Sequence, residues 1–582
     1  MKRMFITVSL LLTSFFLLGE VINNIEIQEK IEAGLIRYEN SDDITIYNYK
    51  AGSPAIPLVS YHFEIPNGKK LESVVLLPKN IEVYQLNTTL MKAPTPVNNS
   101  DSKVVSNEAF QGTPYTEYLV DFTTNQSGPY RFGTVSFYSA LYDNETNSIA
   151  HPQSFELEWV LAEGEISSNP NNNSSSLIAQ ELDLISNRVF TVEKLLYIAT
   201  DEVLTASADL LRFRREQGYE VFTESVSNIL ATTAGIDDAA KLKNYITNQY
   251  MTEGIDYVTL AGDYDIVPYR WAWAFDCEFG MNVLENEIPA DMYFACLDND
   301  WDENQNGIYG EDEDNPDYYP ELFVSRIGFH NATEVTDYTT KLLEYEKGTL
   351  HQDSNYNTSV GLSTNLWSTS NSVLSQEYIL DHYFPSYYSN VIYNEEENTV
   401  NNFVNVIQEM PNIIQHTGHA FHSIMGLDDG YISIDVSESL NQQATTGIFY
   451  SIGCWAGAYD FPSIGESLQL NAPVLGFLCN SRYGWGAPAA DGFGFSEYFQ
   501  KEFFRQYFEQ PELTLSALNS IQKLPFLPYM SGDSVYKWVA YEMNALGDAC
   551  FRPMRNNQRT LTATVEAGED LPGWYLAINV SS

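Results

Sequence analysis

A histidine and a cysteine follow two strand-like runs of this chain, and together they could carry out nucleophilic chemistry. His419 comes just after the run 412–416, and Cys454 comes just after the run 447–452. The carboxyl ends of parallel strands meet at one edge of an open α/β sheet, where such folds place their functional residues. A thiol needs a nearby imidazole to become a thiolate at neutral pH. The pair therefore predicts a cysteine hydrolase.

Two other interpretations of these residues stay open on the sequence. A lone cysteine is most often a buried core residue, which would leave Cys454 without a chemical role. His416, His419 and His422 have a regular spacing that could supply metal ligands, but no second set of cysteines or histidines at metal spacing accompanies them. We interpret His416 as structural, with its ring satisfied by the backbone near the strand end.

An acidic loop further upstream has the spacing of a calcium-binding loop. Asp302, Asn304 and Asn306 alternate and are followed by Gly307, and Glu313 takes the twelfth position counted from Asp302. Such loops use the first, third and fifth side chains, a glycine for the sharp turn and a final bidentate glutamate. We predict a structural calcium ion held by Asp302, Asn304, Asn306 and Glu313. The alternative is an acidic surface loop.

The elements that must position His419 and Cys454 alternate between strand and helix patterns across 189–555. Buried strand-like runs at 194–199 and 257–263 are separated by helical patterns, and the alternation continues to the two site strands. A β-α-β order implies a mostly parallel sheet flanked by helices. The predicted fold class of this region is therefore α/β.

The chain on either side of this region has a different character. Residues 20–163 contain strand-like runs separated by Pro, Gly and Asn turns, which predicts an all-β sandwich. Residues 164–188 are rich in serine and asparagine, and we interpret them as a linker that buries nothing. Residues 556–582 again alternate polar and apolar types, which predicts a short β-rich tail.

The N-terminus and the composition predict an exported protein. Lys2 and Arg3 precede an apolar run that ends near Leu18, so residues 1–19 have the pattern of a signal peptide. No other segment is long and apolar enough to span a bilayer. The formal net charge of −48 disfavours nucleic acid and anionic membrane surfaces as partners. We expect a secreted protein at an extracellular or cell-surface location.

Several motifs, taken in order, resemble those of the gingipain-type cysteine peptidases, a family with a caspase-like fold. The resemblance covers roughly 190–555. The motifs that carry it are His416-Thr417-Gly418-His419-Ala420, Ser451-Ile452-Gly453-Cys454-Trp455-Ala456-Gly457, Leu260-Ala261-Gly262-Asp263 through Pro268, Ala290-Asp291-Met292-Tyr293 through Ile327, and Leu546-Gly547-Asp548-Ala549. This chain departs from the family pattern at Ser325 and Ala420, where the family has glycine, and at Ala549, where it has proline.

The resemblance implies a role for each residue of the site. Cys454 would attack the scissile carbonyl, and His419 would act as acid and base. The backbone N–H groups of Gly418 and Cys454 would form the oxyanion hole. Asn365 falls where family members often place a carboxylate that orients the histidine, and Trp485 falls where they place a tryptophan over the substrate pocket.

The resemblance also implies a fold for the chain and its processing by proteolysis. The fold would be a caspase-like, mostly parallel α/β sheet preceded by a β-sandwich prodomain over 20–163. The protein would then be a zymogen that is cleaved in the 164–188 linker. The segment 361–376 contains no Asp or Glu, so the preference for Arg or Lys substrates that some family members show is not predicted here.

The sequence therefore predicts a secreted cysteine endopeptidase that is made as a zymogen and acts on proteins or peptides. Two rival functions use the same scaffold. One is a catalytically inactive surface or adhesion protein, which the departures at Asn365, Ala420 and Ala549 favour. The other is a transpeptidase, because an acyl-enzyme can be resolved by an amine in place of water.

Overall fold

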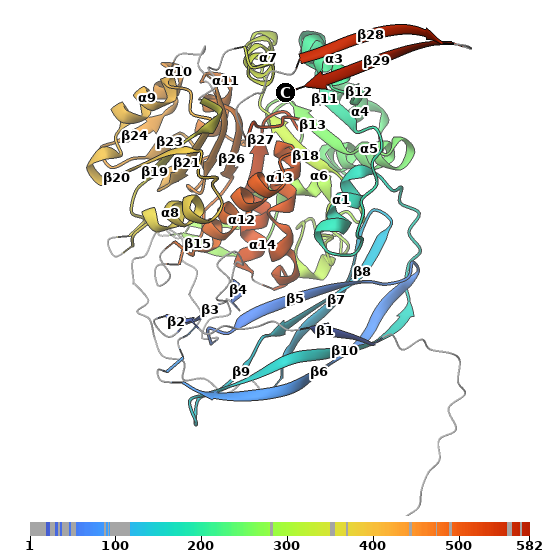
Figure 1. The fold of residues 1–582 in the computed structure, drawn as a ribbon, viewed down its shortest axis with the longest axis vertical. Coiled ribbons are helices and arrows are strands. Elements are labelled where there is room, and N and C mark those ends of the chain that lie inside the picture. Colours follow the sequence, from blue (N-terminus) through green and yellow to red (C-terminus); the bar gives the residue numbers. More distant parts are fainter. Residues whose placement is uncertain are drawn as a thin grey trace, which may run out of the picture.

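The protein consists of a β-domain packed against a larger α/β domain (Figure 1). The computed structural model describes residues 54–86, 117–279, 283–349, 355–367, 370–440, 445–472, 474–487, 492–532, 534–555, 562–570 and 573–581, with short pieces at 19–23, 30–32, 35–37, 46–47, 89–90 and 92. The predicted signal peptide lies outside the described residues, except for Gly19. Among the helices described, none is long and apolar enough to cross a membrane.

The β-domain is a sandwich of antiparallel sheets with one shared core. Phe63 and Val135 of one sheet and Phe155 and Trp159 of the other belong to the same buried cluster, because alternate side chains of each strand point between the sheets. One sheet contains β1 (Gly19–Asn23), β10 (Ser148–Glu163), β6 (Lys69–Gln85) and β9 (Leu141–Asp143); the other contains β4 (Ile46–Tyr47), β5 (Pro57–Glu64), β8 (Tyr130–Tyr138) and β7 (Leu119–Ser127). The predicted N-terminal β region is confirmed.

A ten-stranded sheet forms the centre of the α/β domain. Its strands, in spatial order, are β12 (Glu220–Ser225), β11 (Lys194–Ala199), β13 (Tyr257–Ala261), β18 (Phe323–Ile327), β27 (Met543–Leu546), β26 (Val474–Asn480), β25 (Thr446–Ser451), β21 (Ile413–Thr417), β19 (Thr358–Ser363) and β20 (Ser389–Asn394). Neighbouring strands are parallel except β26 and β27, which are antiparallel. This mostly parallel sheet confirms the predicted fold class.

The antiparallel pair β26 and β27 reverses the strand direction partway across the sheet. The segment that follows β13 nevertheless reaches the segment that follows Cys454, because the rings of Tyr269 and Tyr459 lie 5.9 Å apart. The β-domain contacts the chain just before β18, where the Ser127 hydroxyl donates to the Pro320 carbonyl at 2.6 Å. The β-domain therefore packs near the amino end of β18.

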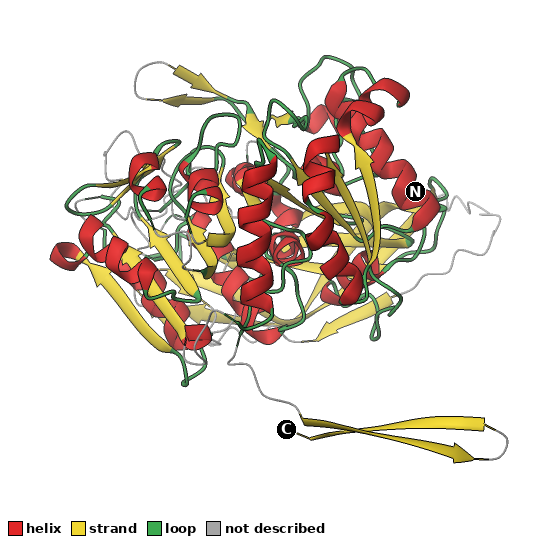
Figure 2. Cartoon of the chain, turned by 90° about the horizontal axis from the view of Figure 1, so that it is seen from above, coloured by secondary structure: helices red, strands yellow, loops and turns green. Residues whose placement is uncertain are grey.

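Helices flank the central sheet (Figure 2). Some of them turn an apolar stripe inward; α9, for example, buries Phe403, Val406 and Ile407, whose spacing matches one face of a helix. These helices are α2 (Asp201–Ala206), α3 (Ala208–Glu216), α4 (Val226–Thr232), α5 (Asp238–Glu253), α7 (Ala332–Glu346), α8 (Val373–His382), α9 (Val400–Gln408), α10 (Ile434–Glu438), α11 (Ile464–Leu470), α12 (Phe495–Glu509), α13 (Leu515–Ile521) and α14 (Val535–Glu542).

The two strands that carry the site are short and fully buried. Every residue of β21 and β25 is buried, as expected for branched and aromatic runs in the middle of a parallel sheet. The strands are adjacent, and their register pairs Ile413 with Ile448 and His416 with Ser451. The segments that follow them, with His419 and Cys454, therefore leave the sheet side by side.

The predicted linker at 164–188 contains a buried helix. Residues Asn173–Glu181 form α1, which is capped by the Asn172 side chain. The Ser174 hydroxyl is buried and donates to the Glu321 carbonyl at 2.8 Å. Small hydroxyl residues can pack closely against a domain when each hydroxyl finds a backbone partner. The prediction that this stretch buries nothing is therefore wrong.

Short hairpins and turns complete the described fold. The predicted β-rich tail forms the hairpin of β28 (Thr562–Asp570) and β29 (Gly573–Ser581), which extends away from the rest of the chain in Figure 2. The remaining short elements are β2 (Lys30–Glu32), β3 (Leu35–Arg37), β14 (Trp271–Ala272), β15 (Cys277–Phe279), β16 (Val283–Glu285), β17 (Ile288–Pro289), β22 (Ala420–Phe421), β23 (Ile424–Gly426), β24 (Tyr431–Ser433), α6 (Met292–Ala295), η1 (Asp312–Asp314), η2 (Asn355–Asn357), η3 (Glu395–Glu397) and η4 (Leu524–Tyr529).

Candidate active site

Cys454 lies on a tight turn directly after β25. The Gly453 N–H donates to the Ser451 hydroxyl oxygen at 3.1 Å, so the chain bends immediately before the cysteine. The Cys454 side chain is 7% exposed, and its Sγ lies 4.0 Å from the Gly484 carbonyl oxygen. The turn thus places a nearly buried thiol at the tip of the strand.

The residue after the cysteine has a strained backbone that neighbouring groups hold in place. Trp455 adopts a left-handed φ of 61°, a conformation that costs free energy for a residue with a large side chain. Its N–H donates to the Arg482 carbonyl at 2.7 Å, and the Arg482 guanidinium lies 4.3 Å from the centre of its ring. Arg482 in turn forms a buried ion pair with Asp460 at 2.6 Å.

His419 is oriented by a backbone carbonyl. Its Nε2 lies 2.9 Å from the carbonyl oxygen of Leu366. Since a carbonyl can only accept, Nε2 carries the proton, and Nδ1 of the neutral ring keeps its lone pair. Burial lowers the pKa of His419 below its usual value, and the hydrogen bond to Leu366 opposes part of that shift. The ring is therefore neutral and able to accept a proton at neutral pH.

Asn365, predicted to orient His419, lies in the loop that presents the Leu366 carbonyl. Its side-chain oxygen accepts from the Ser372 N–H at 3.0 Å. The Ser372 hydroxyl oxygen in turn accepts from the Leu366 N–H at 3.1 Å. The hydrogen bond described for the His419 ring is therefore made by Leu366, the residue after Asn365. The Asn365 amide stabilises the loop that carries it.

His416 is fully buried and links the two site segments. Its Nε2 faces the Gly426 carbonyl at 3.1 Å, and its Nδ1 lies 2.9 Å from the Ser451 hydroxyl. The Ser451 hydroxyl therefore donates to Nδ1 while it accepts from the Gly453 N–H. Burial lowers the pKa of His416 to about 4. These contacts fit the structural interpretation of His416.

One pocket brings the thiol and the imidazole together. His419, Cys454 and Trp485 all contribute to its wall; the full lining consists of Leu366, Trp367, Gly418, His419, Ile452, Cys454, Gly484, Trp485, Gly486, Ser496 and Glu497. The two site segments also touch, because a Cβ at Gly453 would lie only 2.7 Å from the Cβ of Ala420. A substrate bound in this pocket would meet both Cys454 and His419.

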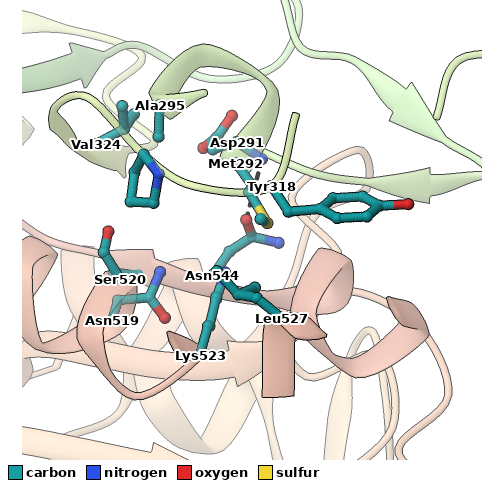
Figure 3. A pocket seen from close by; sticks show the side chains of 12 residues that line it. Asp291, Met292, Ala295, Tyr318, Val324, Asn519, Ser520, Lys523, Leu527 and Asn544 are labelled. Carbon is teal, nitrogen blue, oxygen red and sulfur yellow. Dashed lines mark hydrogen bonds between the residues drawn. The ribbon is translucent and has the colours of Figure 1, made fainter. Parts of the chain in front are cut away.

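A second pocket lies elsewhere in the α/β domain (Figure 3). It is lined by residues of α6, β18 and β27 and by the segment 519–527, with Lys523 and Asp291 among them. Burial lowers the pKa of the Lys523 amine to about 7. None of its lining residues belongs to the pocket that contains His419 and Cys454, so it is separate from the candidate active site.

The sequence motifs did not reveal the roles of four residues that shape the site. Leu366 acts through its backbone, which leaves no side-chain signal. Arg482 and Asp460 are far from each other in sequence, and only the fold pairs them. Glu497 lines the pocket from the first turn of α12, where its carboxylate also accepts from the Gly494 N–H. A glutamate three residues after a helix start is a capping signal, and this signal was readable from the sequence.

The predicted metal ligands lie on one loop, with a change at its end. Asp302, Asn304 and Asn306 follow one another around the turn at Gly307, whereas Glu313 is exposed to solvent. The next residue, Asp314, is buried instead.

The fold, with a thiol and an imidazole on one pocket wall, has the architecture of a cysteine peptidase. The chain belongs to peptidase family C25, whose family model matches residues 190–554. It is therefore a cysteine-type endopeptidase, a hydrolase that acts on peptide bonds. The predicted gingipain-type resemblance is confirmed.

Comparison with solved structures agrees on the fold. A structure described only as a protease is 15% identical, has a TM-score of 0.52, and covers 66% of this chain and 83% of its own. The Arg-specific cysteine proteinase gingipain R is 14% identical, has a TM-score of 0.51, and covers 65% of this chain and 82% of its own. At this level of identity the likeness shows the fold alone. No curated protein matches the sequence.

Proposed function

We propose that this peptidase cleaves peptide bonds with Cys454 as the nucleophile and His419 as the acid and base. The observation that carries the proposal is the shared pocket, where the two residues meet at the tips of adjacent strands. The hydrogen bond from Nε2 to the Leu366 carbonyl leaves Nδ1 as the atom that exchanges protons.

The chemistry would proceed through an acyl-enzyme. Nδ1 of His419 takes the thiol proton, and the thiolate of Cys454 attacks the substrate carbonyl carbon. The oxygen then bears a negative charge, and the backbone N–H groups of Gly418 and Cys454 are the donors that we assign to it. The imidazolium returns its proton to the leaving amine as the C–N bond breaks. Water, deprotonated by His419, hydrolyses the thioester and regenerates the thiol.

We assign substrate binding to the aromatic part of the pocket wall. Trp485 is mostly buried, and its ring packs 5.6 Å from that of Phe275 and 5.8 Å from that of Trp538. A rigid aromatic wall of this kind supplies apolar contact area at low entropic cost. Trp485→Ala should therefore raise KM more than it lowers kcat.

We also propose that the protein is exported as a zymogen. The N-terminal pattern over 1–19 supports export. The β-domain is a folded unit that packs on the α/β domain through buried contacts such as the Ser127 hydroxyl on the Pro320 carbonyl, which supports a prodomain. Processing would fall in an exposed part of 164–192 and not within α1, whose residues from Ser174 to Ala179 are buried.

The test is a comparison of cysteine variants of the purified, processed protein. Cys454→Ala should abolish hydrolysis of a peptidyl-coumarin library and labelling by a peptidyl electrophile. Cys550→Ala is the matched control, because Cys550 is also buried but does not line the pocket. His419→Ala should reduce kcat by about a thousandfold or more. Full activity in Cys454→Ala would overturn the proposal, as would an equal loss in Cys550→Ala.

A further inference from the structure

The loop from Asp302 to Asp314 winds around a cluster of side-chain oxygens. The Asp302 carboxylate accepts from the Gly307 N–H at 3.2 Å. Gly307 has a φ of 83°, a left-handed conformation that glycine adopts without strain and that the sharp turn requires. The Asn304 and Asn306 side-chain oxygens each accept from the backbone N–H two residues ahead, at 2.9 and 2.7 Å. The loop thus has the winding of a cation-binding loop.

Three carboxylates converge on this loop. Asp302 belongs to its first turn, and the Asp314 carboxylate accepts from the Asn304 N–H at 3.3 Å. Glu311 accepts from the side-chain amides of both Asn304 and Asn306, at 2.6 Å from the first. Like charges held this close repel each other unless a cation lies between them. The arrangement therefore concentrates negative charge.

One oxygen of this cluster is buried without a partner. Asp314 is 0% exposed, and within the described residues its Oδ2 has no hydrogen-bond donor. A buried carboxylate oxygen without a donor or cation is costly, so such atoms generally mark a bound ion or water.

Nearby lysines do not neutralise these carboxylates. Lys537 pairs with Asp312 at 2.9 Å. Lys243 donates to the Asn299 carbonyl at 2.5 Å. Among the described residues, Asp312 is thus the carboxylate of this loop that forms an ion pair. Asp302 and Asp314 have no ion pair with a basic side chain there.

We propose that this loop binds one Ca²⁺ through Asp302, Asn304, Asn306 and Asp314, with Glu311 at its rim. Carboxylate and amide oxygens in a flexible loop are the ligands that calcium prefers, whereas magnesium demands a tighter octahedral shell. The proposal changes one predicted ligand. The η1 turn rotates Glu313 to solvent and its neighbour Asp314 into the loop, so the final acidic ligand is one residue later than the spacing predicted.

The calcium ion would stabilise a segment that touches two functional regions. Trp301, next to Asp302, is fully buried and stacks on Tyr541 of α14 with ring centres 5.1 Å apart. Asp298, which lies just before Trp301 in the chain, accepts from the Asn169 amide at 2.9 Å. The loop therefore connects α14, whose Trp538 packs on Trp485, with the segment that follows the β-domain.

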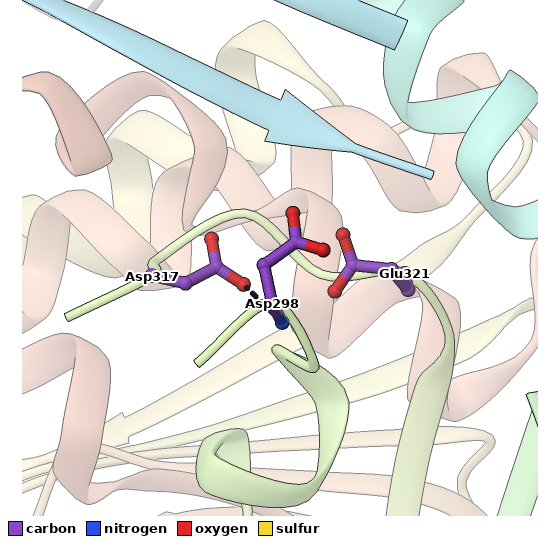
Figure 4. Close-up of side chains that lie close together, drawn as sticks. All are labelled: Asp298, Asp317 and Glu321. Atoms are coloured by element: carbon purple, nitrogen blue, oxygen red, sulfur yellow. Dashed lines mark hydrogen bonds between the residues drawn. The ribbon is translucent and has the colours of Figure 1, made fainter. Parts of the chain in front are cut away.

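A second acidic group lies close by and is the competing location. The side chains of Asp298, Asp317 and Glu321 point toward one another (Figure 4), and their oxygens lie within 4.8 Å. Both oxygens of Glu321, however, already accept from backbone N–H groups, those of Leu297 and Gly128. The group therefore lacks the orphaned oxygen that marks the Asp302 loop.

The experiment measures Ca²⁺ binding by calorimetry and Tb³⁺ luminescence, with Trp301 as the sensitiser, on the full chain carrying Cys454→Ala. The protein with its natural loop residues should bind one Ca²⁺ in this loop. Its Tm should be higher in Ca²⁺ than in EDTA. Asp314→Asn and Asp302→Asn should each weaken binding on the order of tenfold or more. Glu313→Gln, one residue away and exposed, is the matched control and should bind as the parent does.

Asp314→Asn has a second signature that separates loss of a ligand from misfolding. It removes like-charge repulsion, so its Tm in EDTA should equal or exceed that of the parent, while the gain on adding Ca²⁺ disappears. Three outcomes would overturn the proposal: no Ca²⁺ binding by the parent, loss of binding in Glu313→Gln with Asp314→Asn unaffected, or binding that survives both loop variants and is lost in Asp298→Asn.

Discussion

The Nε2 atom of His419 lies 2.9 Å from the carbonyl oxygen of Leu366. A main-chain acceptor persists when its side chain is replaced, so the ring orientation depends on the loop and not on the residue type at 366. The loop is braced by Asn365 and Ser372, which bond across its base. An amide at 365 can therefore support the histidine without touching it.

We predict that Leu366→Ala changes kcat by less than about threefold, whereas Asn365→Ala and Ser372→Ala each lower it by about tenfold, because the carbonyl moves when its brace is lost. Both braces act through one loop, so the double variant should lose much less than the product of the two effects. Steady-state kinetics on all four proteins checks this. A fully multiplicative loss would mean that the two residues act independently.

Gly453 and Ala420 lie close together where the cysteine and histidine segments leave the sheet. A methyl group at 453 would lie 2.7 Å from the Ala420 Cβ, so Gly453→Ala should force the segments apart and cost about 1–3 kcal/mol of stability. Activity should fall more steeply than stability, because the dyad separates. Ala420→Gly should restore most of the activity in the double variant. Without such rescue, the loss would have another cause, such as strain in the turn.

The sequence predicted the elements that depend on local pattern. We could predict the buried runs of β21 and β25 and the order of strands and helices. Both are determined by the positions of branched residues and by the period of the hydrophobic pattern. Three features could not be predicted in this way: the Leu366 contact, the pair of Arg482 with Asp460, and the inward turn of Asp314. The first two depend on which distant parts of the chain the fold brings together. The third depends on a shift of the loop backbone by one residue. The serine-rich helix α1 was missed because its burial depends on tertiary partners and not on its composition.

The stability of the protein should depend on pH through His416. Its pKa is about 4 in the folded protein, against about 6.5 in an unfolded chain. Between these values the unfolded chain binds a proton that the folded chain does not, so stability is present above pH 6.5 and falls as the pH is lowered toward 4. The loss would be roughly 3 kcal/mol.

Denaturant unfolding of the parent and of His416→Asn, both at pH 7 and pH 4.5, would reveal this contribution. The variant removes the titrating group, so its stability should fall less than that of the parent over the same range. Carboxylates titrate in both proteins and cancel in the comparison. An equal fall in the two proteins would assign the pH dependence to those other groups.

The ion pair of Arg482 and Asp460 should matter for the nucleophile turn. Asp460→Asn leaves a buried guanidinium with a weakened partner and should cost about 3 kcal/mol. Because Arg482 also holds Trp455 through its carbonyl and its ring contact, the rate of Cys454 alkylation should change as well. Chemical denaturation and the kinetics of iodoacetamide labelling report the two effects. Unchanged labelling in a destabilised variant would limit the pair to a structural role.

Cleavage of the proposed zymogen should leave the β-domain attached. The stretch between α1 and β11 includes Phe190, which is 77% exposed, and we predict that processing falls there, within 183–192. Such a cut leaves intact the contacts between the β-domain, which precedes α1 in the chain, and the segment just before β18. The Gly128 N–H donates to Glu321 at 3.2 Å, and the Phe132 ring meets that of Tyr319 edge-on at 4.9 Å.

N-terminal sequencing of the processed protein would locate the cut, and gel filtration would show whether the two pieces elute together. Tyr319→Ala removes the central ring of the contact and should allow the β-domain to dissociate, with a rise in activity if that domain limits access to Cys454. Tyr431→Ala, at a site that is 60% exposed, is the control. Separate elution of the parent's fragments would show that these contacts hold the β-domain only while the chain is intact.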